Sequence, residues 1–298
     1  MRLMKGVITP IVTPFNYDEQ QTINYKATKE LIEHLIKHGV DGIFALGTNG
    51  EFQTLSVNER VEFASKVVEI VDKRLPVYAN VGSCSINESV YLAKQMEKVG
   101  VDAITSVAPY FVKVNDEEMF DFFKVVATSV NIPLILYNIP KFVGYSIPVE
   151  VVEKLIKEDI GVKGIKDSSG DMELFKSYVE TSKGYDFNVM VGSDSKISAA
   201  HKLGATACVA GTSNLITDTI VTLWQSLTKN ENEKSEKLQS DIEVLRAVLK
   251  YGTQPSIIKR SITLANIADV GLARKPVRSA DEKTDQKIKE MLYYFNLD

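Results

Sequence analysis

The sequence predicts an α/β protein, a closed (β/α)8 barrel of the TIM type with additional C-terminal helices. Eight short, apolar runs rich in β-branched residues are separated by amphipathic stretches of helical period. The runs begin roughly 20 to 35 residues apart, the spacing of successive β/α units. The alternative is a doubly wound open sheet. It loses support because no GxGxxG follows the first run.

The eight predicted strands share short apolar sequences that end near glycine, proline or polar residues. In a barrel both faces of each strand are covered, and near-continuous apolar runs are therefore expected. They are residues 6–12, 42–46, 76–81, 102–107, 133–138, 161–166, 187–192 and 206–211.

The stretches between these runs carry the start and stop signals of helices. In residues 25–39 the apolar positions 31, 32, 35 and 36 share one face, and charges cover the other. Three helix starts fit a capping box, in which a serine or asparagine precedes a glutamate by three positions: Ser56 with Glu59, Ser85 with Glu88, and Asn115 with Glu118. Helix ends are predicted at Gly39, Gly100 and Gly204.

Four further helical segments follow the eighth run, at residues 215–229, 231–250, 255–268 and 281–295. The first of them completes the barrel, and the others are additional. We therefore expect a catalytic barrel over residues 1–229 and a C-terminal helical region over residues 230–298 that packs on it.

Composition and the absence of targeting signals favour a cytoplasmic protein. The 298 residues carry a net charge of −4, which argues against a nucleic-acid surface. No run approaches the roughly 18 apolar residues of a membrane span, and the first residues lack a signal-peptide core. The two cysteines, Cys84 and Cys208, form no CxxC motif, so a reducing compartment is expected.

The sixth run, "GVKGIK", holds two lysines on opposite faces. Side chains alternate along a strand, so Lys166 shares a face with Gly164, and Lys163 shares the other with Ile165. Ile165 suits the helix layer, and this places Lys166 inside, at the C-terminal rim where barrel active sites lie. Burial favours a neutral amine, which can form a Schiff base with a ketone. The alternative is a lysine paired with a buried carboxylate.

Two other rim segments carry side chains suited to the same chemistry. Tyr137 ends the fifth run, and a phenol there can move protons to and from a substrate. Alternatively it is an amphipathic aromatic with its hydroxyl in a rim hydrogen bond. The segment "LGTNGEF" follows the second run, and Gly47, Thr48 and Asn49 within it can form an anion-binding nest or an ordinary tight turn.

Taken together, these features resemble the family of dihydrodipicolinate synthase and N-acetylneuraminate lyase, which are class I pyruvate-type aldolases on a (β/α)8 barrel. The resemblance runs from about residue 5 to residue 279. The matching motifs are "TPF" (13–15), "GTNGE" (47–51), "YNIP" (137–140), "GIKDSSGD" (164–171) and "GSD" (192–194). The sequence is most similar to the 2-keto-3-deoxygluconate aldolase branch.

The resemblance implies roles for individual residues. Lys166 is the Schiff-base lysine, Tyr137 the general acid/base, and Thr48 part of the proton relay. Asn49 and Gly47 lie in the loop that holds the 2-oxo acid carboxylate. The remaining implied substrate contacts are Tyr110, Ser168, Ser169, Asp194 and the backbone of Val209 and Gly211. The resemblance also implies a homotetramer and a reaction that needs no metal or organic cofactor, because the protonated imine is the electron sink.

Several positions depart from the family pattern and bear on the substrate. Asn49 stands where the family usually has Thr or Ser. Phe111 replaces a tyrosine that reaches across a dimer interface. Either the relay is shorter here, or Tyr110 serves in its place. Phe142 stands where the synthases carry an arginine for the semialdehyde carboxylate, and Lys141 is expected to point elsewhere. Ser195 replaces a glutamate of the sialic acid lyases.

These departures favour a 2-keto-3-deoxy sugar acid aldolase. Dihydrodipicolinate synthase and N-acetylneuraminate lyase remain alternatives with the same imine chemistry. A non-catalytic 2-oxo acid binding paralogue is an alternative of a different class.

Overall fold

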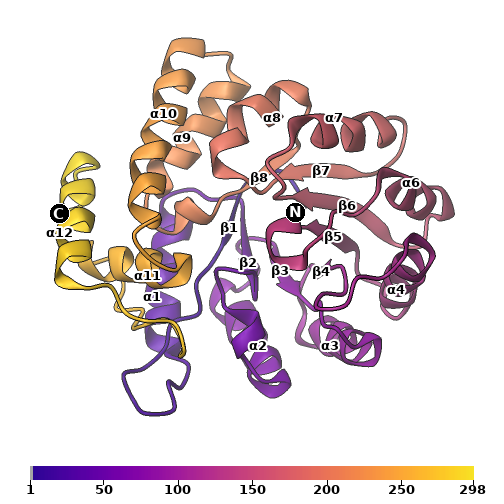
Figure 1. The fold of residues 1–298 in the computed structure, drawn as a ribbon, viewed down its shortest axis with the longest axis horizontal. Coiled ribbons are helices and arrows are strands. Elements are labelled where there is room, and N and C mark those ends of the chain that lie inside the picture. The colour runs from indigo at the N-terminus through magenta and orange to yellow at the C-terminus, as the bar shows by residue number, and fades with distance from the viewer. Residues whose placement is uncertain (1–2) are drawn as a thin grey trace.

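Eight parallel strands close into a barrel in which each strand pairs with its neighbours in chain order, and β8 pairs with β1 (Figure 1). The computed structural model describes residues 3–298. The strands are β1 (Gly6–Pro10), β2 (Gly42–Ala45), β3 (Val77–Asn80), β4 (Ala103–Val107), β5 (Leu134–Asn138), β6 (Val162–Asp167), β7 (Asn188–Val191) and β8 (Ala207–Val209). Seven of the strands lie within a predicted run, β6 extends one residue beyond its run, and the predicted fold class is confirmed.

Helices cover the outside of the barrel. They are α1 (Tyr25–Lys37), α2 (Val57–Val71), α3 (Ile86–Val99), α4 (Asp116–Thr128), α6 (Val149–Glu158), α7 (Met172–Thr181), α8 (Ile197–Leu203) and α9 (Thr217–Thr228), with a short α5 (Pro140–Val143) at the rim. The capping boxes at Ser56 and Asn115 are complete, whereas Ser85 accepts from the Glu88 amide without the reciprocal bond.

The predicted helix ends follow glycine conformation. Gly39, Gly100 and Gly204 have φ angles of +81°, +87° and +105°. These angles lie in the left-handed region that a side chain disfavours. The chain can therefore leave each helix sharply and enter the next strand within a few residues.

Three C-terminal helices lie outside the ring: α10 (Asn232–Leu249), α11 (Gln254–Leu264) and α12 (Glu282–Tyr294). Helix α10 packs on α9 and α8, and α12 packs on α10 and α11 at the outer edge (Figure 1). Ile242 and Leu245 of α10 are fully buried in the same core as the barrel helices. The division into regions at residue 229 stays a prediction.

The described chain holds two unpaired cysteines, Cys84 at the surface and Cys208 buried in β8. Within residues 3–298, none of the helices combines the length and the apolar character needed to cross a bilayer.

Candidate functional site

Lys166 projects into the barrel interior between two aromatic rings. Lys166 is only 4% exposed. Its Nζ lies 3.9 Å from the ring centroid of Tyr137 and 4.8 Å from that of Phe44. Within residues 3–298 no carboxylate oxygen comes within 4.0 Å of this amine. The Lys166 amine therefore faces aromatic rings. It does not form the ion pair with a buried carboxylate that the sequence left as an alternative.

Lys163 lies on the other face of β6, as the alternation of side chains predicts. Its Nζ is 2.7 Å from Asp159 and 3.9 Å from Asp186, both exposed carboxylates. The two lysines of "GVKGIK" therefore have different environments, and only Lys166 faces the barrel interior.

Tyr137 of β5 and Thr48 of the loop after β2 belong to the same part of the site. Tyr137 pairs in register with Lys166 across β5 and β6 and is 3% exposed. Its hydroxyl lies 3.1 Å from the hydroxyl of Thr48, in the loop after β2. A phenol and a second hydroxyl in hydrogen-bond contact next to an amine can pass a proton between them.

The loop after β2 is held by buried polar contacts. The hydroxyl of Thr13 donates to the carbonyl of Gly50 at 2.6 Å. Glu51 has a φ of +54° and forms a 2.6 Å ion pair with Lys259 of α11, and both side chains are at most 1% exposed. Leu46 at the other end of the loop is also left-handed, with φ of +61°. These contacts fix Thr48 and Asn49 from both sides.

A layer of polar residues supports the C-terminal ends of β5 and β6. Asn138 donates to Asp167 at 2.7 Å, and the Ser169 hydroxyl donates to the other carboxylate oxygen at 2.8 Å. Burial raises the pKa of Asp167, against the effect of these hydrogen bonds. The Ser169 hydroxyl is thus engaged by Asp167 rather than turned to a substrate.

Ser168 lies close to the lysine. A Cβ added to Gly192 would lie 2.1 Å from the Ser168 hydroxyl oxygen and 2.8 Å from Cε of Lys166. Both side chains therefore pack against the Cα of Gly192, and any larger residue at 192 would displace them.

Asp194 is buried where the chain leaves β7. Its carboxylate accepts from the amides of Gly211 at 3.2 Å and Thr212 at 2.8 Å, and burial raises its pKa. It joins the loops after β7 and β8 and also lines the cavity described next. Val209 is buried in β8 and does not line that cavity, whereas Gly211 lies against the Asn49 side chain.

A cavity of about 610 Å³ opens over this rim. Thr48, whose hydroxyl contacts the Tyr137 hydroxyl, lies in its wall, so the cavity borders the group of residues around Lys166. Its lining comes from the rim loops and from the C-terminal helices: Thr48, Asn49, Glu51, Phe52, Gln53, Thr54, Val107, Tyr110, Ile139, Lys141, Phe142, Val143, Asp194, Arg246, Leu249, Lys250, Gly252, Thr253, Gln254, Pro255 and Val277.

Tyr110 and Phe111 have opposite environments. Tyr110 lines the cavity with its ring edge-on to Phe52 at 6.4 Å, and burial raises its pKa. Phe111 is 97% exposed, with a left-handed φ of +75°. Within one subunit, the structure brings Tyr110 to the site and leaves Phe111 outside.

Lys141 lies on the cavity wall, and the expectation that it points elsewhere was wrong. Its Nζ is 5.4 Å from the ring centroid of Phe142, and both residues line the cavity. A cation over an aromatic face is an attractive contact. Because α5 is only one turn long, adjacent side chains on it can reach the same opening.

The sequence reasoning missed several residues of the site, among them Phe44, Arg246 and Gln254. Phe44 follows from strand alternation in β2 and could have been found that way. Gln254 and Arg246 belong to the C-terminal helices, and no local pattern in them indicates a place at the rim.

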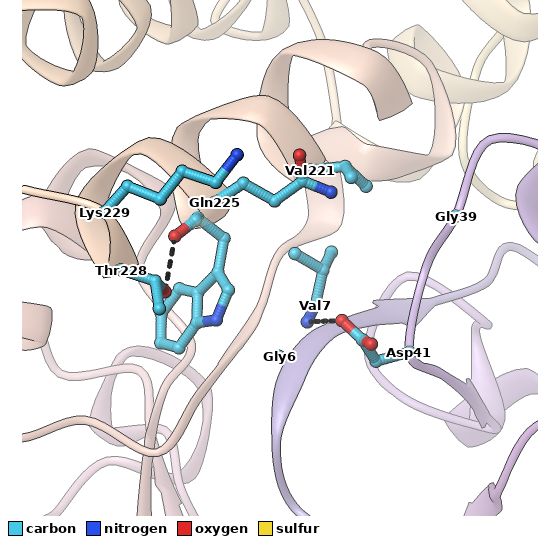
Figure 2. Close-up of a pocket in the computed structure, with 9 residues that line it drawn as sticks. Gly6, Val7, Gly39, Asp41, Val221, Gln225, Thr228 and Lys229 are labelled. Atoms are coloured by element: carbon cyan, nitrogen blue, oxygen red, sulfur yellow. Dashed lines mark hydrogen bonds between the residues drawn. The ribbon is translucent and has the colours of Figure 1, made fainter. Parts of the chain in front are cut away.

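A smaller hollow of about 260 Å³ lies at the opposite end of the barrel, beside the start of β1 (Figure 2). Two of its polar groups are used by the fold: Asp41 accepts from the Val7 amide at 2.8 Å, and Thr228 donates to the Trp224 carbonyl at 2.9 Å. Figure 2 shows Asp41 turned toward the Val7 backbone. This hollow is separate from the lysine.

Comparison with known proteins agrees with this geometry. The model of the "Dihydrodipicolinate synthetase family" matches residues 3–294. The chain belongs to this family. Its members are pyruvate-dependent lyases that form a Schiff base with a lysine, and this protein is therefore a class I aldolase of the dihydrodipicolinate synthetase family.

Relatives within the family carry different activities in their names. The chain is 31% identical to a 4-hydroxy-tetrahydrodipicolinate synthase of Methanopyrus kandleri, over 97% of this chain and 94% of that one. It is 30% identical to a probable 2-dehydro-3-deoxy-D-pentonate aldolase of Escherichia coli, over 98% and 97%. The solved structure of YagE, an E. coli prophage protein of the family in complex with pyruvate, matches with a TM-score of 0.94 at 28% identity over 100% of both chains.

Proposed function

We propose that this aldolase reversibly cleaves a 2-keto-3-deoxy sugar acid, such as 2-keto-3-deoxygluconate, to pyruvate and an aldehyde, through an imine on Lys166. The observation that carries the proposal is the placement of a buried lysine amine 3.9 Å from the Tyr137 ring, whose hydroxyl meets Thr48 at the cavity wall.

The reaction follows from these groups. The Lys166 amine attacks the C2 ketone, water leaves, and a protonated imine forms. Tyr137 takes the proton of the C4 hydroxyl as the C3–C4 bond breaks. The bond electrons move into the imine and give the enamine of pyruvate, while the aldehyde departs. Protonation at C3 and hydrolysis then release pyruvate and restore the amine. Thr48 relays the proton and, with Asn49, orients the carboxylate.

The cavity wall supports a sugar acid as substrate. Phe142 and Val143 line the side where a synthase needs a bidentate arginine for its second carboxylate. Ser195 stands in place of the glutamate expected of sialic acid lyases. The 30% identity to a relative named as a probable pentonate aldolase also supports a sugar acid as substrate.

Dihydrodipicolinate synthase activity is the second candidate. Lys141, Arg246 and Lys250 line the cavity and supply cations for a second carboxylate without the usual arginine. A relative named as a synthase is also 31% identical to this chain.

Borohydride reduction in the presence of pyruvate tests the proposed imine. We expect a single pyruvate-derived adduct in the intact mass, mapped to Lys166 by peptide analysis. It should be absent in Lys166→Ala and retained in Lys163→Ala, the matched control on the same strand. An unmodified wild-type protein would favour the binding paralogue, and an adduct on Lys163 would refute the assignment.

Turnover assays then separate the substrates. We expect pyruvate release from 2-keto-3-deoxygluconate or its five-carbon analogue, and little condensation of pyruvate with aspartate semialdehyde. The reverse preference would establish synthase activity and overturn the sugar-acid proposal. Preferred cleavage of N-acetylneuraminate would overturn the sugar-acid proposal in favour of a sialate lyase.

A further inference from the structure

We propose that Gln254, at the start of α11, is a positioning residue that orients the Asn49 amide so that its NH₂ group faces the substrate carboxylate. Nε2 of Gln254 donates to Oδ1 of Asn49 at 3.2 Å, and both side chains line the cavity. This inference rests on the proposed imine at Lys166, since it concerns how the carboxylate of that 2-oxo acid is held.

The bond decides which end of the Asn49 amide is free. An asparagine amide has one acceptor oxygen and one NH₂ donor, on opposite sides of the same carbon. With the oxygen occupied by Gln254, the NH₂ is directed elsewhere. No residue within 3–298 accepts from Asn49 Nδ2, although Asn49 is only 8% exposed. A largely buried donor without an acceptor, on a residue that lines the cavity, suits an anionic ligand.

Packing fixes the side chain on its other side. A Cβ added to Gly211 would lie 2.5 Å from Asn49 Nδ2, so the amide rests directly on the Gly211 Cα. The loop that contains Gly211 is itself held by Asp194 through the amides of Gly211 and Thr212. The Asn49 amide is thereby clamped between this loop and Gln254.

Gln254 is held firmly enough to act as an orienting group. Helix α11 is tied to the loop of Asn49 by the buried Lys259–Glu51 ion pair at 2.6 Å. The hydroxyl of Ser256 donates to the carbonyl of Arg278 at 2.7 Å and fixes the first turn. A substitution at 254 therefore leaves these anchors in place and changes chiefly the contact with Asn49.

The need for such a residue follows from the asparagine itself. A threonine or serine at position 49, the residues usual in the family, carries a hydroxyl that rotates to donate in any direction. An amide donates only from its NH₂ end, so its side chain has to be oriented with that end toward the ligand. Gln254 supplies that orientation for the amide of Asn49.

The test measures the pyruvate concentration that gives half-maximal borohydride trapping at Lys166. We expect Gln254→Ala to raise it about threefold to tenfold, the effect of one lost hydrogen bond. Gln254→Glu should raise it further, because a carboxylate accepts from Nδ2 and turns the Asn49 oxygen toward the ligand. In an Asn49→Thr background, Gln254→Ala should change the value less than about twofold. Gln286→Ala, exposed on α12, is the matched control for wild-type behaviour.

Two results would overturn the inference. The first is half-maximal trapping at the wild-type concentration in both Gln254 variants. The second is that Gln254→Glu raises the half-maximal pyruvate concentration by the same factor in an Asn49→Ala background as in the wild-type protein. The introduced charge would then act on the ligand directly and not through Asn49. Unchanged thermal unfolding midpoints show that the effect is local. Failure of the wild-type protein to trap pyruvate at Lys166 is a different outcome, which refutes the proposed function itself.

Discussion

At the scale of single residues, the two aromatic rings around Lys166 suit a positive charge. The Lys166 Nζ lies 4.8 Å from the ring centroid of Phe44 and 3.9 Å from that of Tyr137, and the faces of such rings attract a cation. The imine proposed at Lys166, once protonated, would carry its positive charge where the amine was. The same rings can therefore stabilise the intermediate that the reaction forms, in an interior that excludes water.

Tyr137→Phe separates the ring from the hydroxyl. The ring over Lys166 remains, so we expect pyruvate trapping to continue. Aldol cleavage should slow by about 10²- to 10⁴-fold, the usual contribution of a general acid/base. Steady-state rates of pyruvate release measure the change. Tyr185→Phe, at a 47% exposed tyrosine, is the control. Cleavage at the wild-type rate in Tyr137→Phe would assign the proton transfer to another group.

At the scale of elements, the loop after β2 depends on a helix far along the chain. Lys259 of α11 pairs with Glu51, and the second Glu51 oxygen accepts from the Arg274 amide at 2.8 Å. Desolvation lowers the pKa of Lys259 to about 8, although its partner opposes the shift. The pair joins the loop of Thr48 to the C-terminal region.

Lys259→Met leaves the Glu51 carboxylate buried without its cation. We expect a loss of about 3–5 kcal/mol in the free energy of unfolding, measured with urea. Glu51→Gln combined with Lys259→Met should recover part of it, because no unpaired charge remains. The exposed pair Lys287–Glu290 provides the control, and Lys287→Met should behave like the wild type. Wild-type stability in Lys259→Met would show that the pair is dispensable.

At the scale of the whole molecule, the cavity spans the boundary predicted near residue 229. Thr48 and Phe142 belong to the barrel, whereas Arg246, Thr253 and Gln254 come from α10, α11 and the turn between them. Because the same helices bury Ile242 and Leu245 against the barrel, they contribute both to the core and to the site.

We expect a homotetramer, with a mass four times the 33.1 kDa of the chain in light scattering after size exclusion. Phe111 and Val112 are 97% and 67% exposed in the single chain, and adjacent apolar side chains of this kind favour burial against another subunit. Phe111→Asp should therefore reduce the assembly to smaller species. A wild-type mass of one chain, or a variant that assembles normally, would contradict this prediction.

Local patterns were sufficient for much of this protein. The eight apolar runs indicated the strands, the glycines at 39, 100 and 204 the helix ends, and side-chain alternation the inward position of Lys166. Each of these depends on neighbours a few positions away, where the backbone alone relates one side chain to the next.

Other features were settled only by long-range packing. The hydrogen bond between Gln254 and Asn49 joins residues 205 positions apart. The direction of Lys141 and the engagement of Ser169 by Asp167 depend on how the rim loops fold against one another. Loop conformation follows from contacts between distant segments, and no short-range periodicity encodes it. The residues that complete the site are for this reason visible in the folded chain and not in its local sequence.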